Sequence, residues 1–127
     1  RTTFRSGDRT LDNMLEECRT KFSDRNPLVR REALERLWDA WERLKSLADP
    51  RDKKQSIKII LDAVAAEPTL RSRLETEAVE LTAIGNSHLI RHSEVNQVAV
   101  IDVDHVDYLF HRLFAMIQLM LRRKGNA

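Results

Sequence analysis

A short polar segment in the second half of the chain holds the residue types that could carry out chemistry. Arg91 and His92 are adjacent, with Asn86 before them and Glu94 two residues after the histidine. Histidine transfers protons near neutral pH, and a neighbouring arginine can hold a phosphate and offset charge in a transition state. This combination suits attack by an RNA 2′-hydroxyl without a metal. His92 would be the general acid or base, and Arg91 would hold the phosphate. Asn86 or Glu94 would orient them.

A metal site is a second interpretation of the same region. All four histidines of the chain fall there or in the segment that follows it, at His88, His92, His105 and His111. Only the first two have the four-residue spacing that places two imidazoles on one helix face, and no cysteine is near. The sequence therefore predicts no metal and no cofactor.

A third interpretation is structural, with these side chains serving ion pairs and packing. The pairs expected are Arg91 with Glu94 or Asp102, and His111 and Arg112 with acidic residues of the segment 75–80.

Composition limits the class of protein that could position these residues. The chain has 127 residues, 42% of them hydrophobic and 33% charged, with a net charge of +2. It is too apolar to be disordered, and its longest apolar run, near residues 113–121, is too short to span a membrane. The single cysteine, Cys18, excludes an internal disulfide and occupies an apolar helical position, so we expect it in the core. We expect a cytoplasmic protein with no membrane partner.

Apolar periodicity and capping residues predict an all-α antiparallel bundle of about five helices. The strongest signal is Asn26-Pro27, a capping residue followed by proline, ahead of a stripe that includes Trp38 and Trp41. Thr10, Asp52 and Asp102 or Asp104 are the other expected caps. The helices are expected at about residues 11–22, 27–48, 53–66, 70–85 and 103–124. Gly85-Asn86 would end or only bend the fourth helix, and the apolar period would permit its continuation to Leu89 and Ile90.

The last helix and the loop before it differ from the rest. The loop, at residues 93–103, is long for a compact domain, and its apolar stretch 97–101 is read as an extended connection. The helix is apolar over more than half of its circumference, which predicts burial on two sides and a homodimer formed through it.

The chain is expected to be one helical domain at residues 10–124. Residues 1–9 would be a tail or linker remnant, and residues 125–127 a C-terminal tail. Because the sequence opens on Arg1, we expect another domain of a longer protein as a further partner.

Three blocks resemble the abortive-infection C-terminal type of domain, which is related to the HEPN group of helical bundles. They are LTAIGN at 81–86, IRHSE at 90–94 and DYLFHRLF at 107–114, and WDAWERL at 38–44 is similar as well. The resemblance implies a helical bundle, often dimeric, from prokaryotic defence or toxin systems. Many HEPN proteins are metal-independent ribonucleases with an arginine, a polar residue and a later histidine. Here Gly85 stands at the arginine position, and Arg91 directly precedes His92.

Three functions follow from these observations. The chain is a ribonuclease acting at the Arg-His segment, an RNA-binding module of a larger protein, or a non-catalytic dimerisation element. An RNA-binding module would need a basic surface, for which the candidates are Arg30, Arg31, Arg36 and Arg43.

Overall fold

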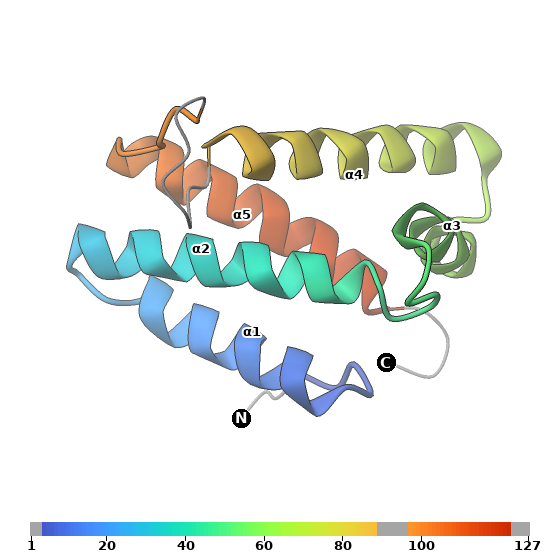
Figure 1. Ribbon diagram of the computed structural model, residues 1–127, viewed down its shortest axis with the longest axis horizontal. Helices are drawn as coiled ribbons and strands as arrows, with labels where there is room; N and C mark the ends of the chain where they lie inside the picture. The colour runs from blue at the N-terminus through green and yellow to red at the C-terminus, as the bar shows by residue number, and fades with distance from the viewer. Residues whose placement is uncertain (1–3, 89–96, 123–127) are drawn as a thin grey trace.

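The structure is a computed structural model that describes residues 4–88 and 97–122 (Figure 1). Five helices account for most of these residues: α1 (Arg9–Phe22), α2 (Pro27–Leu44), α3 (Lys53–Val64), α4 (Pro68–His88) and α5 (Val103–Met120). Within the two described ranges there is no β-strand. The predicted all-α bundle of five helices, with a long connection before the last one, is confirmed.

In the view of Figure 1, α5 crosses obliquely between α2 and α4, and α2 and α4 also contact each other directly through hydrogen bonds from Trp41 and Lys45 to Thr82. Helix α1 packs on α2, and α3 lies across the end of the bundle that receives the C-terminus of α5. The pairs α1–α2 and α4–α5 are antiparallel, whereas α2 and α5 run in the same direction (Figure 1). The starts of α2 and α5 and the end of α4 therefore lie at one end of the molecule.

Side-chain caps fix where most helices begin. Asn26, Asp52 and Asp102 each accept a hydrogen bond from a main-chain N–H of the following turn, as the sequence predicted. The first cap differs: Asp8 accepts from the Leu11 amide, so α1 begins before Thr10. Asp8 is also fixed by Arg43, whose Nη2 lies 3.0 Å from its Oδ1.

The ends of α2 and α5 differ from the sequence prediction, since α5 ends at Met120 and not near residue 124. Helix α2 ends at Leu44 and not at residue 48, because the chain turns there and the Ala48 amide donates to the buried Ser56 hydroxyl of α3 at 3.0 Å. Helix α4 continues through Gly85 to His88 without a break, as the apolar period of this segment allowed. Glycine at this position allows α4 to pack closely against Trp38 of α2.

The core is a single apolar cluster to which four of the helices contribute most. Trp41 is fully buried and Trp38 is 7% exposed, which confirms the predicted tryptophan stripe, and Cys18 is fully buried in α1. Helix α5 supplies six buried residues, namely Val106, Phe110, Leu113, Met116, Ile117 and Met120. Phe4 packs on the edge of this cluster, with its ring perpendicular to that of Phe114.

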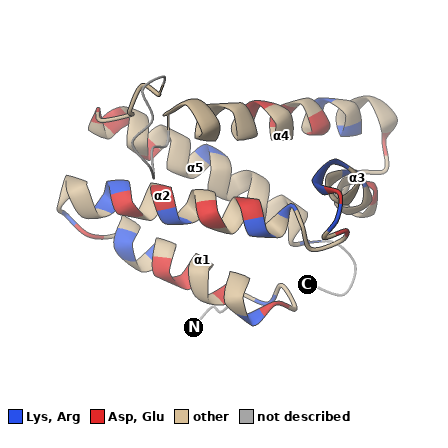
Figure 2. Cartoon of the chain, viewed as in Figure 1, with Lys and Arg blue, Asp and Glu red and all other residues tan. Residues whose placement is uncertain are grey.

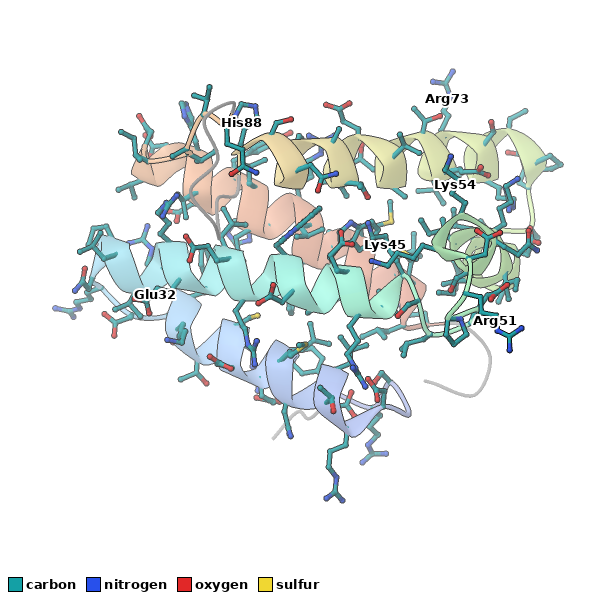
Figure 3. All side chains as sticks on the ribbon, viewed as in Figure 1. Glu32, Lys45, Arg51, Lys54, Arg73 and His88 are labelled. Carbon is teal, nitrogen blue, oxygen red and sulfur yellow. The ribbon has the colours of Figure 1, made fainter. Side chains whose placement is uncertain are left out.

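One cation, Lys45, is buried with this core at the end of α2 (Figure 3). Its ammonium lies over the rings of Trp38 and Trp41, at 5.4 and 5.2 Å from their centroids. It donates to the Thr82 hydroxyl at 2.7 Å and pairs with Glu42 at the same distance. Burial lowers the pKa of Lys45, and the pairing with Glu42 opposes that shift. The group joins α2 to the middle of α4.

Candidate functional site at one end of the bundle

Of the four predicted catalytic residues, only Asn86 is among those that the structure describes. Asn86 lies in the last turn of α4 with an exposed side chain. Arg91, His92 and Glu94 lie outside the described residues, so their predicted roles stay predictions.

A glycine in contact with an indole ring sets the position of this end of α4. A Cβ atom built on Gly85 would lie 2.0 Å from Cζ3 of Trp38, far inside van der Waals contact. Only glycine lets α4 approach α2 this closely. Asn86 and His88 therefore occupy fixed positions beside the core.

Residues 97–100 lie against the C-terminus of α4. The Val98 amide donates to the Ser87 carbonyl at 3.0 Å, and the Val100 amide to the His88 carbonyl at 3.3 Å. The Gln97 side chain donates to the Asn86 carbonyl at 2.8 Å. These contacts satisfy carbonyl groups that the end of a helix leaves without partners.

His88 is fixed by the same connection (Figure 3). Its Nδ1 lies 2.7 Å from the Val98 carbonyl, which can only accept, so Nδ1 carries the proton in this hydrogen bond. His105, near the start of α5, lines the same groove as His88, together with Asp102 and Tyr108. Two of the four histidines thus share one surface.

The other described histidine, His111, has a packing role. Its ring lies edge-on to the Phe22 ring, with centroids 5.3 Å apart. The neighbouring Arg112 donates to both carboxylate oxygens of Glu77 at 2.7 and 2.8 Å, linking α5 to α4. The structural interpretation is confirmed for Arg112, which contacts the predicted acidic face of α4.

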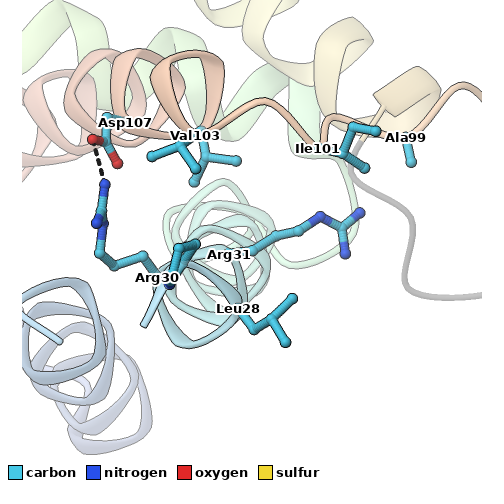
Figure 4. A pocket seen from close by; sticks show the side chains of 9 residues that line it. Leu28, Arg30, Arg31, Ala99, Ile101, Val103 and Asp107 are labelled. Atoms are coloured by element: carbon cyan, nitrogen blue, oxygen red, sulfur yellow. Dashed lines mark hydrogen bonds and ion pairs between the residues drawn. The ribbon is translucent and has the colours of Figure 1, made fainter. Parts of the chain in front are cut away.

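Two adjoining grooves flank the connection at residues 97–102. The wider one, of about 540 Å³, is open between the end of α4 and the start of α5. The narrower one, of about 280 Å³, lies between the start of α2 and the start of α5 (Figure 4). Ile101 lines both and is 79% exposed. The two grooves therefore form one continuous surface.

Exposed apolar side chains gather on this surface. Five large ones line the two grooves: Leu28, Val98, Ile101, Val103 and Tyr108. We call these five residues the end-face patch. Sequence reasoning did not find it, because Leu28 at the start of α2 is far in the sequence from the other members, which lie within residues 98–108. The one available signal was the uncharged run Val98-Ala99-Val100-Ile101, which we interpreted only as an extended connection.

The four arginines of α2 proposed as an RNA surface all have acidic partners. Arg30 pairs with Asp107 at 2.6 Å (Figure 4), and Arg31 with Glu35 at 2.8 Å. The remaining pairs are Arg36 with Glu17 and Asp39, and Arg43 with Asp8. Lys, Arg, Asp and Glu are accordingly interspersed along α1 and α2 (Figure 2). Because these four arginines are paired with carboxylates, this face has little free positive charge with which to bind a phosphate backbone.

Among the residues that the structure describes, no three His, Cys, Asp or Glu side chains are grouped so that they could hold a metal ion. Nor is any helix in residues 4–88 and 97–122 long and apolar enough to cross a bilayer. Comparison of the chain with protein-family models, with curated proteins and with solved structures found no match.

Proposed function

We propose that this chain is a helical assembly module that forms a homodimer through the end-face patch. The observation that carries the proposal is the exposure of five large apolar side chains on one continuous surface. Tyr108 is 61% exposed and Leu28 is 71% exposed, although each stands next to residues of the core. Contiguous apolar patches larger than a few hundred Å² on a folded protein mark interaction sites.

The size of the patch fits a partner of this kind. Side chains of these types, exposed to 38–79%, present on the order of 500 Å² of apolar surface. A standard protein interface buries roughly 800 Å² on each partner, with an apolar centre and a polar rim. The patch would supply the centre. Asp102 and Arg31, which line the two grooves, stand where the rim would be.

The test is the mass of the protein in solution, measured by light scattering after size exclusion. Ile101→Lys places a charge at the centre of the patch and should convert the dimer to a monomer. Val79→Lys is the matched control, because Val79 is 63% exposed on α4 away from the patch. If Ile101→Lys and Val79→Lys both formed dimers of equal stability, the interface would lie elsewhere.

A second candidate function is RNA cleavage without metal, as the resemblance to HEPN domains of prokaryotic defence proteins implies. Three described residues favour it: the Asn86 side chain is exposed at the end of α4, and His88 and His105 line one groove beside it. Assembly through the end-face patch would also bring two copies of this surface together.

The ribonuclease proposal is tested by incubating the chain with single-stranded RNA in excess chelator. Loss of cleavage in both Arg91→Ala and His92→Ala would support it, with His111→Ala as the control for a histidine that only packs against rings. A folded wild-type dimer that leaves RNA intact would refute the enzyme and keep the assembly module.

A further inference from the structure

Main-chain groups at the centre of the end-face patch have no partner in the described structure. The main-chain groups of Val98 and Val100 are directed into the bundle. Both amides donate to carbonyls at the end of α4, the Val98 carbonyl accepts from His88, and the Val100 carbonyl accepts from Arg31 Nε. Ala99 and Ile101, in contrast, make no hydrogen bond within residues 4–88 and 97–122.

This alternation is that of an extended strand with one edge free. In extended chains, successive residues direct their N–H and C=O groups to opposite sides. The Val98 and Val100 groups are satisfied on the inner side, so those of Ala99 and Ile101 face away from it. The side chains of Val98, Ala99 and Ile101 are all exposed, and residues 97–101 carry no charge. Natural proteins usually protect such an edge with charges, prolines or a covering segment.

We propose that the edge at residues 97–101 pairs antiparallel with the same edge of a second copy, about a two-fold axis at Ala99. The proposal rests on the assembly function and specifies its contact. Ala99 of one copy would exchange main-chain hydrogen bonds with Ala99 of the other, and Ile101 of each copy with Gln97 of the other. Strand addition of this kind uses main-chain hydrogen bonds that any free edge offers.

The local sequence favours a second copy over an unrelated peptide. Val98-Ala99-Val100 reads the same in both directions, so antiparallel pairing about Ala99 places valine opposite valine on both sides of the axis. The small Ala99 side chain at the axis would not separate the two strands. A two-fold contact of this kind is self-complementary and closes at the dimer. The exposed side chains of Leu28 and Tyr108 on either side add apolar area.

Single cysteines test the register of the pairing in the full chain. In a hydrogen-bonded antiparallel pair, facing Cα atoms are about 5.5 Å apart, which a disulfide can bridge. Ala99→Cys should therefore form a disulfide-linked dimer on mild oxidation. In Val98→Cys, the new cysteine would face Val100 of the second copy. The two cysteines would be diagonal neighbours, with their Cα atoms about 7–8 Å apart, beyond disulfide reach. Val79→Cys is the exposed control away from the patch. The buried Cys18 is common to all three.

We expect cross-linking of Ala99→Cys to be at least roughly tenfold faster than that of either control, because assembly holds its two thiols together. The masses of the reduced proteins are measured in parallel. A reduced dimer in which Ala99→Cys links no faster than Val98→Cys would overturn the strand pairing and leave the assembly function standing. Reduced proteins that are monomeric at every concentration would overturn both.

Discussion

Gly85 of α4 lies against the face of Trp38 of α2, so close that a single added methyl group would overlap the indole ring. Both residues are buried. The contact fixes the distance between the two helices at the end of the bundle that carries the grooves. It also explains a glycine inside a helix, where it costs about 1 kcal/mol relative to alanine.

Gly85→Ala should therefore destabilise the domain, although alanine is the better helix former. We expect a loss of about 1–3 kcal/mol in the free energy of unfolding, because the indole or the helix has to move. Urea unfolding measures the loss. Ala83→Gly, at an exposed position of the same helix, should cost about 1 kcal/mol through helix propensity alone. A Gly85→Ala variant as stable as wild type would show that the contact is loose.

Removing the Trp41 side chain should strongly destabilise the domain. It is fully buried and its indole N–H donates to the Thr82 hydroxyl at 3.2 Å. Trp41→Ala should lower the free energy of unfolding by ~3–5 kcal/mol. Leu70→Ala, where the side chain is 53% exposed, should change it by less than about 1 kcal/mol. If Trp41→Ala and Leu70→Ala both lowered the free energy of unfolding by the same small amount in thermal or urea unfolding, the assignment of Trp41 to the core would be contradicted.

The sequence specified the helices well where the signal is local. Asn26-Pro27, Asp52 and Asp102 begin helices through contacts within three residues, and the spacing of the tryptophans marks a buried face. It failed where a tertiary contact decides. The end of α2 depends on the Ser56 hydroxyl, which accepts from the Ala48 amide eight residues earlier in the chain. The close approach of α4 to α2 depends on the contact of Gly85 with Trp38, which no local pattern indicates.

The candidate site was predictable only in part for the same reason. Residue types singled out Asn86 and the histidines, and His88 and His105 do line one groove. The end-face patch combines Leu28 with Val98 and Tyr108, which are far apart in the sequence. No periodicity links these positions, so the patch emerges only once the helices are placed.

The Glu77–Arg112 pair should make stability depend on pH below the usual carboxyl range. The hydrogen bonds from Arg112 lower the pKa of Glu77 below its ordinary 4.5, and burial opposes the shift. The unfolded chain therefore binds the proton more readily. The contribution of Glu77 is present above 4.5 and is lost as the pH falls through its lowered pKa.

Glu77→Gln should accordingly flatten the dependence of the unfolding midpoint on pH in this acidic window. The measurement is thermal unfolding followed by circular dichroism across the window. A Glu77→Gln variant with the wild-type slope would show that the pair contributes nothing to stability.

Cys18 should be inert in the folded protein. Its side chain is fully buried, and burial raises the pKa of the thiol to about 12, so almost no thiolate forms near neutral pH. A thiol-specific reagent should label it only as fast as the domain unfolds, and at once in denaturant. Rapid labelling of the native protein would place Cys18 outside the core.

The assembly proposal is tested most directly by sedimentation equilibrium of the unaltered chain over a wide range of concentrations. We predict a mass that rises with concentration from that of one chain to that of two, and stops there, because a two-fold contact closes at the dimer. The mass of one chain at every concentration would contradict the proposal, and a mass that keeps rising beyond two chains would contradict the two-fold contact.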